Sequence, residues 1–163
     1  MKNNQNTVAS YKRAIYSGTF DPITIGHMDI IKRALNIFDE VVIAVATSES
    51  KKPMFSLDER VEFVQAATNG IDGVVIKPFN TLLVDLASSL EINTIIRGLR
   101  AVSDFEYELQ MGYANASINN DIETLYLMPT LENAFVSSTI VREIIKFEGK
   151  FEHLVPKEII KCM

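Results

Sequence analysis

The sequence predicts an α/β protein with a single doubly wound domain, in which helices cover both faces of a five-stranded parallel sheet. Three observations lead to this prediction. Strand-like and helix-like segments alternate from one end of the 163-residue chain to the other. The strand-like segments are continuously apolar, as in parallel strands that are buried on both faces. The length suits one domain with one core and is short for two.

The first elements are a strand, a helix and a second strand. Residues 13–17 form a short apolar run that ends at a glycine, which predicts a strand. Residues 26–38 carry apolar side chains at helical spacing, and residues 40–46 are again continuously apolar. The preceding segment is polar and rich in asparagine, so we expect residues 1–12 to be a disordered extension and residues 13–163 to be the domain.

The middle of the chain continues the alternation. A capping box, with Ser56 as the cap and Glu59 three residues later, begins a helix that extends to about residue 69. The next expected elements are a strand, a helix and a strand, at residues 73–77, 82–90 and 93–97.

The last third should hold the longest helix, the fifth strand and two closing helices. Ser103 and Glu106 match a second capping box, and the helix that they begin extends to about residue 118. Its apolar stripe consists of Phe105, Leu109, Gly112, Tyr113 and Ala116. The elements expected after it are a strand at residues 123–128 and helices at residues 138–147 and 156–161.

Composition limits the function classes. The net charge of −5 argues against non-specific binding to nucleic acid, which needs a basic surface. No apolar run reaches the roughly 20 residues that span a bilayer, and the polar first residues lack the apolar core of a signal peptide. The single cysteine, Cys162, cannot form an internal disulfide. These features predict a cytoplasmic protein that binds neither nucleic acid nor membrane.

Residues after the first strand have the chemistry of a phosphate site. In a parallel sheet, ligands bind at the carboxyl ends of the strands, where the chain order reverses. Gly18 allows close approach of a ligand, and Thr19 offers a hydroxyl and an amide. Gly26 and His27 begin a helix, whose N-terminal amides favour an anion. The alternative is an ordinary loop with a surface histidine, but the two glycines and the threonine favour the phosphate site.

Basic residues follow the second and fourth strands. Two lysines follow the second strand, and at least one of them, such as Lys51, could face the ligand instead of solvent. Arg97 follows a buried strand directly, and a guanidinium there needs an anion or solvent. With Arg100 it suits phosphate groups. A salt bridge to Asp104 or Glu108 is the alternative, and it fits Arg100 better than Arg97.

Three hydroxyl residues follow the fifth strand. Ser137, Ser138 and Thr139 lie at a helix start, where a single hydroxyl is enough for a cap. Three in succession indicate a second anion site, with ordinary capping as the alternative. Phosphate-friendly residues thus follow four of the five strands, which predicts a nucleotide and a second phosphorylated ligand. Two histidines and one terminal cysteine are too few for zinc, and neither a P-loop nor GxGxxG is present.

Two motifs resemble signatures of the nucleotidyltransferase superfamily. Residues 24–27 (TIGH) resemble its (H/T)xGH motif, and residues 136–142 (VSSTIVR) resemble its ISSTxxR motif. Three further segments resemble the bacterial phosphopantetheine adenylyltransferases, namely residues 16–22 (YSGTFDP), 50–55 (SKKPMF) and 96–108 (IRGLRAVSDFEYE). The resemblance extends from about residue 13 to the C-terminal helix, and it implies a Rossmann-like nucleotidyltransferase fold.

The resemblance also implies a reaction, in which the adenylyl group of ATP moves to 4′-phosphopantetheine and gives dephospho-coenzyme A and pyrophosphate. It implies Mg²⁺ bound through the ATP phosphates, no metal site on the protein itself, and a homohexamer. The residues implied to be catalytic are His27, Thr19, Lys51 and Arg97. Those implied to contact ATP are Thr19, Phe20, His27, Gly98, Leu99, Arg100, Glu108, Asn133, Ala134, Phe135, Val136, Ser137, Ser138 and Thr139. Those implied to contact phosphopantetheine are Thr19, Lys51, Leu83 and Arg97.

The chain departs from the family pattern at three positions. Ser17 replaces a common proline, Ile25 a common asparagine and Asn133 a frequent aromatic residue, which leaves the adenine-side contacts near Asn133 open. Two other functions stay open. One is a different adenylyl- or cytidylyltransferase, such as a nicotinate mononucleotide adenylyltransferase, against which residues 97–108 argue. The other is a non-catalytic nucleotide sensor, against which the full set of phosphate-binding residues argues.

Overall fold

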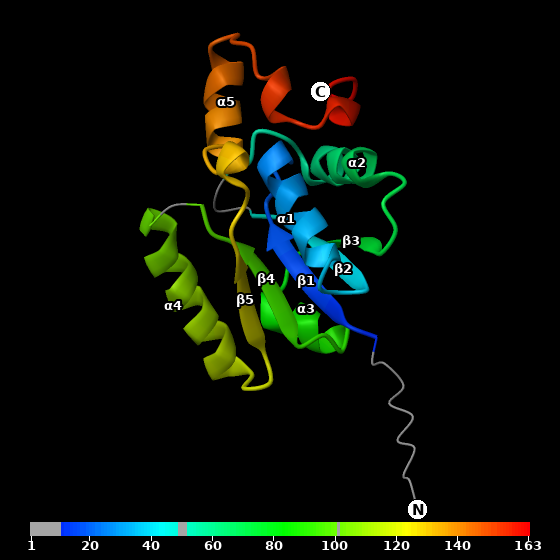
Figure 1. The fold of residues 1–163 in the computed structure, drawn as a ribbon, viewed down its shortest axis with the longest axis vertical. Helices are drawn as coiled ribbons and strands as arrows, with labels where there is room; N and C mark the ends of the chain where they lie inside the picture. Colours follow the sequence, from blue (N-terminus) through cyan, green and yellow to red (C-terminus); the bar gives the residue numbers. More distant parts are fainter. Residues whose placement is uncertain (1–10, 49–51, 101) are drawn as a thin grey trace, which may run out of the picture.

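The computed structural model describes residues 11–48, 52–100 and 102–163, and it confirms the predicted α/β class. Five parallel strands form one sheet in the order β3-β2-β1-β4-β5 (Figure 1). The strands are β1 (Arg13–Gly18), β2 (Glu40–Ala46), β3 (Val74–Phe79), β4 (Thr94–Gly98) and β5 (Glu123–Leu127). The chain order reverses between β1 and β4, which is where a doubly wound sheet binds its ligands.

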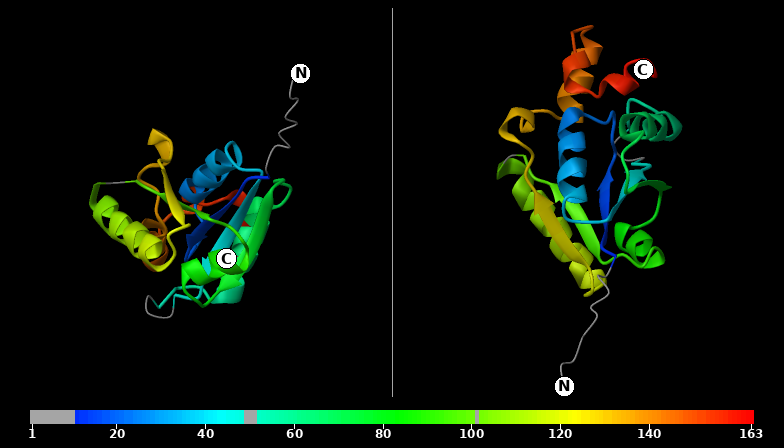
Figure 2. Two further views of the ribbon diagram at one scale, coloured as in Figure 1. Left: turned by 90° about the horizontal axis from the view of Figure 1, so that it is seen from below. Right: turned by 45° about the vertical axis from the view of Figure 1, so that its right-hand side comes forward.

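Helices cover both faces of this sheet (Figures 1 and 2). The α-helices of the described residues are α1 (Ile25–Leu35), α2 (Leu57–Thr68), α3 (Leu83–Ser89), α4 (Val102–Ile118) and α5 (Ser138–Lys146). Short 3₁₀ helices also follow β5 and α5, namely η2 (Leu131–Asn133), η3 (Glu152–Leu154) and η4 (Lys157–Ile159). None of these described helices is long and apolar enough to cross a membrane.

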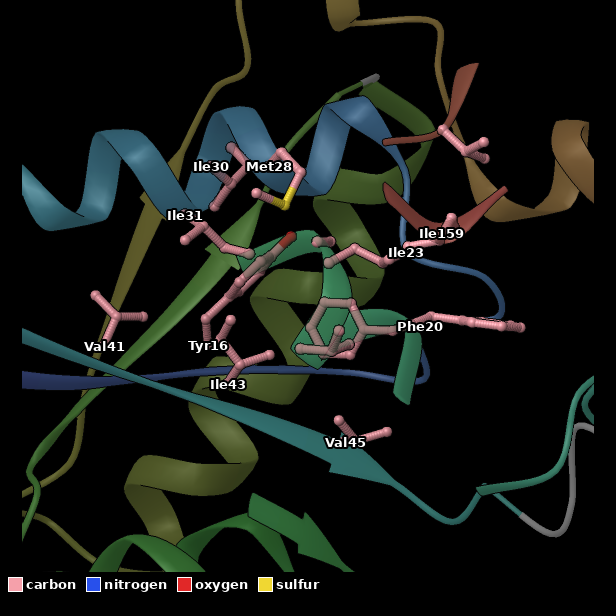
Figure 3. Close-up of a cluster of buried hydrophobic side chains, with 14 of the residues drawn as sticks. Tyr16, Phe20, Ile23, Met28, Ile30, Ile31, Val41, Ile43, Val45 and Ile159 are labelled. Atoms are coloured by element: carbon pink, nitrogen blue, oxygen red, sulfur yellow. The ribbon is translucent and has the colours of Figure 1, made fainter. Parts of the chain in front are cut away.

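The core has two parts because neighbouring residues of a strand point to opposite faces of the sheet. Tyr16 of β1 packs with α1 and α2 on one face, together with Ile159 of η4 (Figure 3). Ile15 packs on the other face with α3 residues such as Val84. Burial on both faces explains why the central strands are continuously apolar.

Several predicted boundaries are wrong by a few residues. Helix α1 ends at Leu35, earlier than predicted, because the following N–H groups bind back to the carbonyl of Ala34 and close a turn. Strand β3 is longer than predicted and extends to Phe79, which pairs in register with Ala46. The α-helix predicted at residues 156–161 is instead the short η4.

The long helix α4 is turned about its axis relative to the prediction. It begins at Val102, so the predicted cap Ser103 lies inside the helix. Phe105 and Tyr113 of the predicted apolar stripe are 44% and 69% exposed. The buried side of α4 instead contains Glu108, because this carboxylate pairs with an arginine at the end of β4.

The domain also begins slightly earlier than predicted. The N–H of Lys12 donates to the Asp39 carboxylate at 2.7 Å, and its carbonyl accepts the N–H groups of Asp39 and Glu40. Lys12 is therefore part of the folded domain rather than of an extension. Residues 1–10 of the predicted extension lie outside the described residues.

Candidate functional site

Two adjoining cavities lie at the carboxyl ends of β1 and β4. The larger has a volume of about 440 Å³ and is walled by these strand ends and by the starts of α1 and α5. The smaller has a volume of about 260 Å³ and extends towards α3 and α4. Both cavities are lined by Ser17, Gly18, Thr19, Arg97, Tyr107 and Glu108. A ligand in one cavity therefore lies next to a ligand in the other.

The structure brings most of the predicted site residues to these cavities. Those that line the larger cavity are Thr19, Phe20, His27, Arg97, Gly98, Arg100, Glu108, Val136, Ser137, Ser138 and Thr139. Those that line the smaller cavity are Thr19, Leu83, Arg97 and Glu108. The predicted ATP residues that line neither are Leu99, Asn133, Ala134 and Phe135. Lys51 lies outside the described residues.

The first motif packs directly against the segment that precedes α5. A Cβ atom on Gly26 would lie 3.0 Å from the carbonyl oxygen of Val136 and 3.4 Å from that of Asn133. A residue with a side chain would push these backbones apart, so glycine lets the start of α1 meet the second motif. The Asn133 side chain itself donates to Thr130 at 2.9 Å, and its backbone carbonyl borders the first motif.

His27 is held as a neutral imidazole at the start of α1. Thr24 caps the helix: its hydroxyl accepts the His27 N–H at 3.4 Å, and its own N–H donates to His27 Nδ1 at 3.0 Å. Because Nδ1 accepts, the neutral ring carries its proton on Nε2. Burial, with Arg100 and Arg97 nearby, lowers the pKa of His27 to about 3. The ring can therefore donate from Nε2 to an anion in the cavity while uncharged itself.

Arg97 is anchored on two sides. Its Nε and Nη2 donate to the two carboxylate oxygens of Glu108 at 2.6 Å, and its Nη1 donates to the carbonyl and hydroxyl oxygens of Ser17 at 2.9 and 3.0 Å. Burial opposes the charge, but the Glu108 hydrogen bonds raise the pKa of Arg97 overall.

Arg97 therefore forms a salt bridge, which we expected less for it than for Arg100. The orientation of α4 turns Glu108 towards the end of β4 and so towards Arg97. Arg100 donates to the carbonyl of Val136 at 3.1 Å. The serine that replaces the common proline at position 17 supplies a hydroxyl that helps to hold Arg97.

Two further site residues were missed by the sequence analysis. The Asp21 carboxylate accepts the N–H groups of Met54 and Phe55, both at 2.9 Å. Arg142 donates to the Asp21 carbonyl at 2.7 Å, lies 3.4 Å from its carboxylate, and lines the larger cavity. The position of Arg142 at the end of the ISSTxxR motif was the signal that could have identified it.

The three hydroxyls after β5 have different partners. Ser137 caps α5 and accepts a backbone N–H of its first turn at 3.2 Å. Ser138 donates to the carbonyl of Pro22 at 2.8 Å. Thr139 accepts from Arg142 at 3.2 Å. The capping alternative thus describes Ser137 alone. The Ser138 hydroxyl connects α5 to the loop after β1, and the Thr139 hydroxyl binds an arginine of the same helix that lines the cavity.

Positive groups dominate the larger cavity. Arg97, Arg100 and Arg142 line it, and guanidinium groups bind phosphate oxygens in a bidentate way. Its two carboxylates, Asp21 and Glu108, each pair with an arginine. In the part of the chain that the structure describes, no three His, Cys, Asp or Glu residues are grouped to hold a metal ion.

Comparison with known proteins gives the class first. A crystal structure of a protein described as a nicotinate-nucleotide adenylyltransferase, from Vibrio parahaemolyticus, has the same fold. Its TM-score is 0.69 over 88% of this chain and 92% of its own, at 17% sequence identity. A family model for cytidylyltransferase-like proteins matches residues 15–144. By its fold and its family, the chain is therefore a nucleotidyltransferase.

Phosphopantetheine adenylyltransferases from Nautilia profundicola and Campylobacter curvus are 59% and 57% identical to this chain, over 93% of it and over 98% and 97% of their own lengths. The one from Helicobacter hepaticus is 61% identical over 88% of this chain and 87% of its own. The chain belongs to the phosphopantetheine adenylyltransferase family.

Proposed function

We propose that this protein transfers the adenylyl group of ATP to 4′-phosphopantetheine, which yields dephospho-coenzyme A and pyrophosphate. The observation that carries the proposal is the pair of cavities that share Thr19 and Arg97 at the switch point of the sheet. Two phosphorylated substrates can meet there. Relatives that are 59% and 61% identical carry the name of this reaction.

The chemistry of the two cavities suggests which substrate each one takes. The larger suits the triphosphate, since arginines and the neutral His27 line it. The smaller suits the pantetheine arm, because its wall includes the apolar Leu83 and Met111. The phosphate of phosphopantetheine then lies between them, at Thr19 and Arg97. On the family likeness we assign Lys51 to the same phosphate.

The reaction depends on positioning and on charge stabilisation. An oxygen of the phosphopantetheine phosphate attacks the α-phosphorus of ATP. A new P–O bond forms while the bond to the bridging oxygen breaks, and pyrophosphate leaves with that electron pair. The nucleophile is already an anion, so no general base is required. The Nε2–H of His27 donates to the α-phosphate as charge builds there, and Arg97 keeps the attacking phosphate in place.

We propose that Mg²⁺ reaches the site on the phosphates of ATP. Asp21 and Glu108 are the carboxylates that line the larger cavity, and their arginine partners lie at 3.4 and 2.6 Å. Neither is therefore free to serve as a dedicated ligand, which fits coordination by phosphate oxygens and water. When bound, the ion would neutralise part of the charge on the triphosphate.

Pyrophosphate release tests the proposed reaction. The protein with Mg²⁺, ATP and phosphopantetheine should release pyrophosphate in equal amounts with dephospho-coenzyme A. Pyrophosphate release with nicotinate mononucleotide as the acceptor, and none with phosphopantetheine, would favour the reaction for which the structural neighbour is named. Binding of ATP without release from either acceptor would favour a nucleotide sensor.

On the family likeness we also propose a cytoplasmic homohexamer. Large apolar side chains of α4 support assembly, because they are exposed in the single chain, namely Phe105, Tyr107, Met111, Tyr113 and Ile118. Such a surface is the kind that a partner subunit covers. Sedimentation velocity should give six times the mass of the 18.3 kDa chain, and a monomer at micromolar concentration would contradict the assembly.

A further inference from the structure

Arg60, in α2, is the largest of the fully buried side chains that the structure describes, with 1% of its surface exposed. Its guanidinium donates to four backbone carbonyls, those of Phe55, Thr19, Ala46 and Thr47, at 3.1, 2.7, 2.7 and 3.1 Å. No carboxylate of the described residues lies within ion-pairing distance of it. A buried charge is costly, and here backbone dipoles alone compensate it by direct contact.

Two of these carbonyls, at the edge of the site, precede residues with a left-handed backbone. The Thr19 carbonyl precedes Phe20, and the Thr47 carbonyl precedes Ser48. Phe20 and Ser48 have φ angles of 50° and 52°, in the left-handed region that residues with side chains rarely adopt. Arg60 therefore holds the peptide group that precedes each of these two left-handed residues.

The hydroxyls of Thr19 and Ser48 meet each other. Thr19 Oγ1 and Ser48 Oγ are 2.9 Å apart. Thr19 lines both cavities, and Ser48 lines the smaller one. By binding the Thr19 carbonyl on one side and the Ala46 and Thr47 carbonyls on the other, Arg60 ties together the two backbones whose hydroxyls form this pair.

We propose that Arg60 is a positioning residue for adenylyl transfer, which keeps the Thr19–Ser48 hydroxyl pair in place to receive the phosphate of phosphopantetheine. The role rests on the proposed function. A planar guanidinium can donate to several carbonyls in fixed directions, whereas a lysine ammonium is a point donor that cannot reach all of them. An apolar side chain would leave the carbonyls without donors.

Four variants test this role. R60K keeps the positive charge but loses the planar guanidinium that donates to several carbonyls. S48A keeps Arg60 and removes one hydroxyl of the Thr19–Ser48 pair. The double variant R60K/S48A combines the two changes. R13K is the matched control, because Arg13 donates to the carbonyl of Leu90 at the opposite end of β1. Kinetics are measured well below the melting temperature of each variant, so that all of them are folded.

R60K and S48A should each lower kcat/KM for phosphopantetheine about tenfold, while KM for ATP changes by less than about twofold. R13K should change neither. The double variant should have about the same kcat/KM for phosphopantetheine as R60K, because both changes act through the Thr19–Ser48 pair. Losses that multiply, or a fall in melting temperature with unchanged kcat/KM, would overturn the role.

Two further results keep the proposal decidable. If R60K does not fold, S48A decides alone, and an unchanged kcat/KM for phosphopantetheine overturns the proposal. If the unaltered protein releases no pyrophosphate, the proposed function fails, and a crystal structure of R60K then judges the positioning role. A parted Thr19–Ser48 pair would support that role, and a pair still 2.9 Å apart would overturn it.

Discussion

The capping box of α1 serves two purposes with one pair of residues. Thr24 satisfies an N–H group of the first helical turn, and its own N–H decides which nitrogen of His27 carries the proton. A neutral donor suits this site, because an imidazolium would be repelled by Arg97 and Arg100. Local helix chemistry and the chemistry of the site are thus set by one pair of residues.

His27→Ala is expected to lower kcat by about 10²–10³, because the variant loses a donor that acts as charge builds in the transition state. KM for phosphopantetheine should change little, since we assign the acceptor phosphate to Thr19 and Arg97 rather than to His27. Steady-state kinetics with each substrate varied separately measure both constants. His153→Ala, at an exposed position, is the control, and a near-normal kcat in His27→Ala would refute the assignment.

The pKa of His27 also predicts how stability depends on pH. The unfolded chain takes up this proton near pH 6.5, whereas the folded chain does so near pH 3. As the pH falls from 6.5 towards 3, the unfolded state therefore binds more protons, and the free energy of unfolding decreases. His27 contributes a slope of at most about 1.4 kcal/mol per pH unit.

Urea unfolding at several pH values between 6.5 and 4 tests that slope. His27→Gln should flatten the decrease, and His153→Gln should leave it as steep as in the unaltered protein. An equally steep decrease without His27 would show that other groups cause it.

At the scale of elements, the start of α5 is fastened to the loop after β1. Ser138 donates to Pro22, and Arg142 donates to Asp21, across 116 and 121 residues of sequence. These bonds fasten the second motif (residues 136–142) to the loop that leads from β1 to the first motif (residues 24–27). Gly26 of the first motif also packs against the carbonyl of Val136, so a substitution in either motif should disturb the other.

Ser138→Ala removes one of these connections. Because the hydroxyl is engaged by Pro22, we expect the ligand-free protein to lose about 0.5–1.5 kcal/mol of stability, the range for one hydrogen bond. Urea unfolding without ligand measures this loss, and calorimetric titration with ATP measures any change in affinity. Ser117→Ala is the control, since that exposed hydroxyl bonds only within α4. Weaker ATP binding at unchanged stability would instead place the Ser138 hydroxyl on the ligand.

At the scale of the whole molecule, one cavity gathers positive groups in a chain whose net charge is −5. Its arginines come from β4, from the segment after it and from α5, and they lie near one another before a polyanion binds. Bound ATP should therefore stabilise the entire fold rather than a single loop.

Saturation with ATP is expected to raise the melting temperature. At a concentration about 100 times Kd, binding adds about 2.7 kcal/mol, which for a chain of this length corresponds to about 5–10 °C. Differential scanning calorimetry over a series of ATP concentrations measures the shift. Arg142→Ala should show a smaller shift at equal ATP, and the absence of any shift in the unaltered protein would contradict ATP binding at this site.

The sequence predicts features that depend on neighbouring residues better than features that depend on contacts between distant segments. The fold class followed from the apolar runs, and most site residues followed from their positions after strands. The Arg97–Glu108 pair did not, because it depends on the orientation of α4 about its own axis. Arg60 reads in sequence as one more charged residue of a surface helix, and the segments that bury it come from elsewhere in the chain.

The walls of the larger cavity come from segments between Tyr16 and Arg142. Strand β1 is synthesised first, yet the hydrogen bond from Arg97 to its Ser17 spans 80 residues. On the ribosome, the nascent chain holds β1 and α1 long before the strand and the helix that complete the cavity have emerged. A nascent chain that has not yet reached Arg142 therefore lacks part of the wall of this cavity, and we expect it not to turn over ATP.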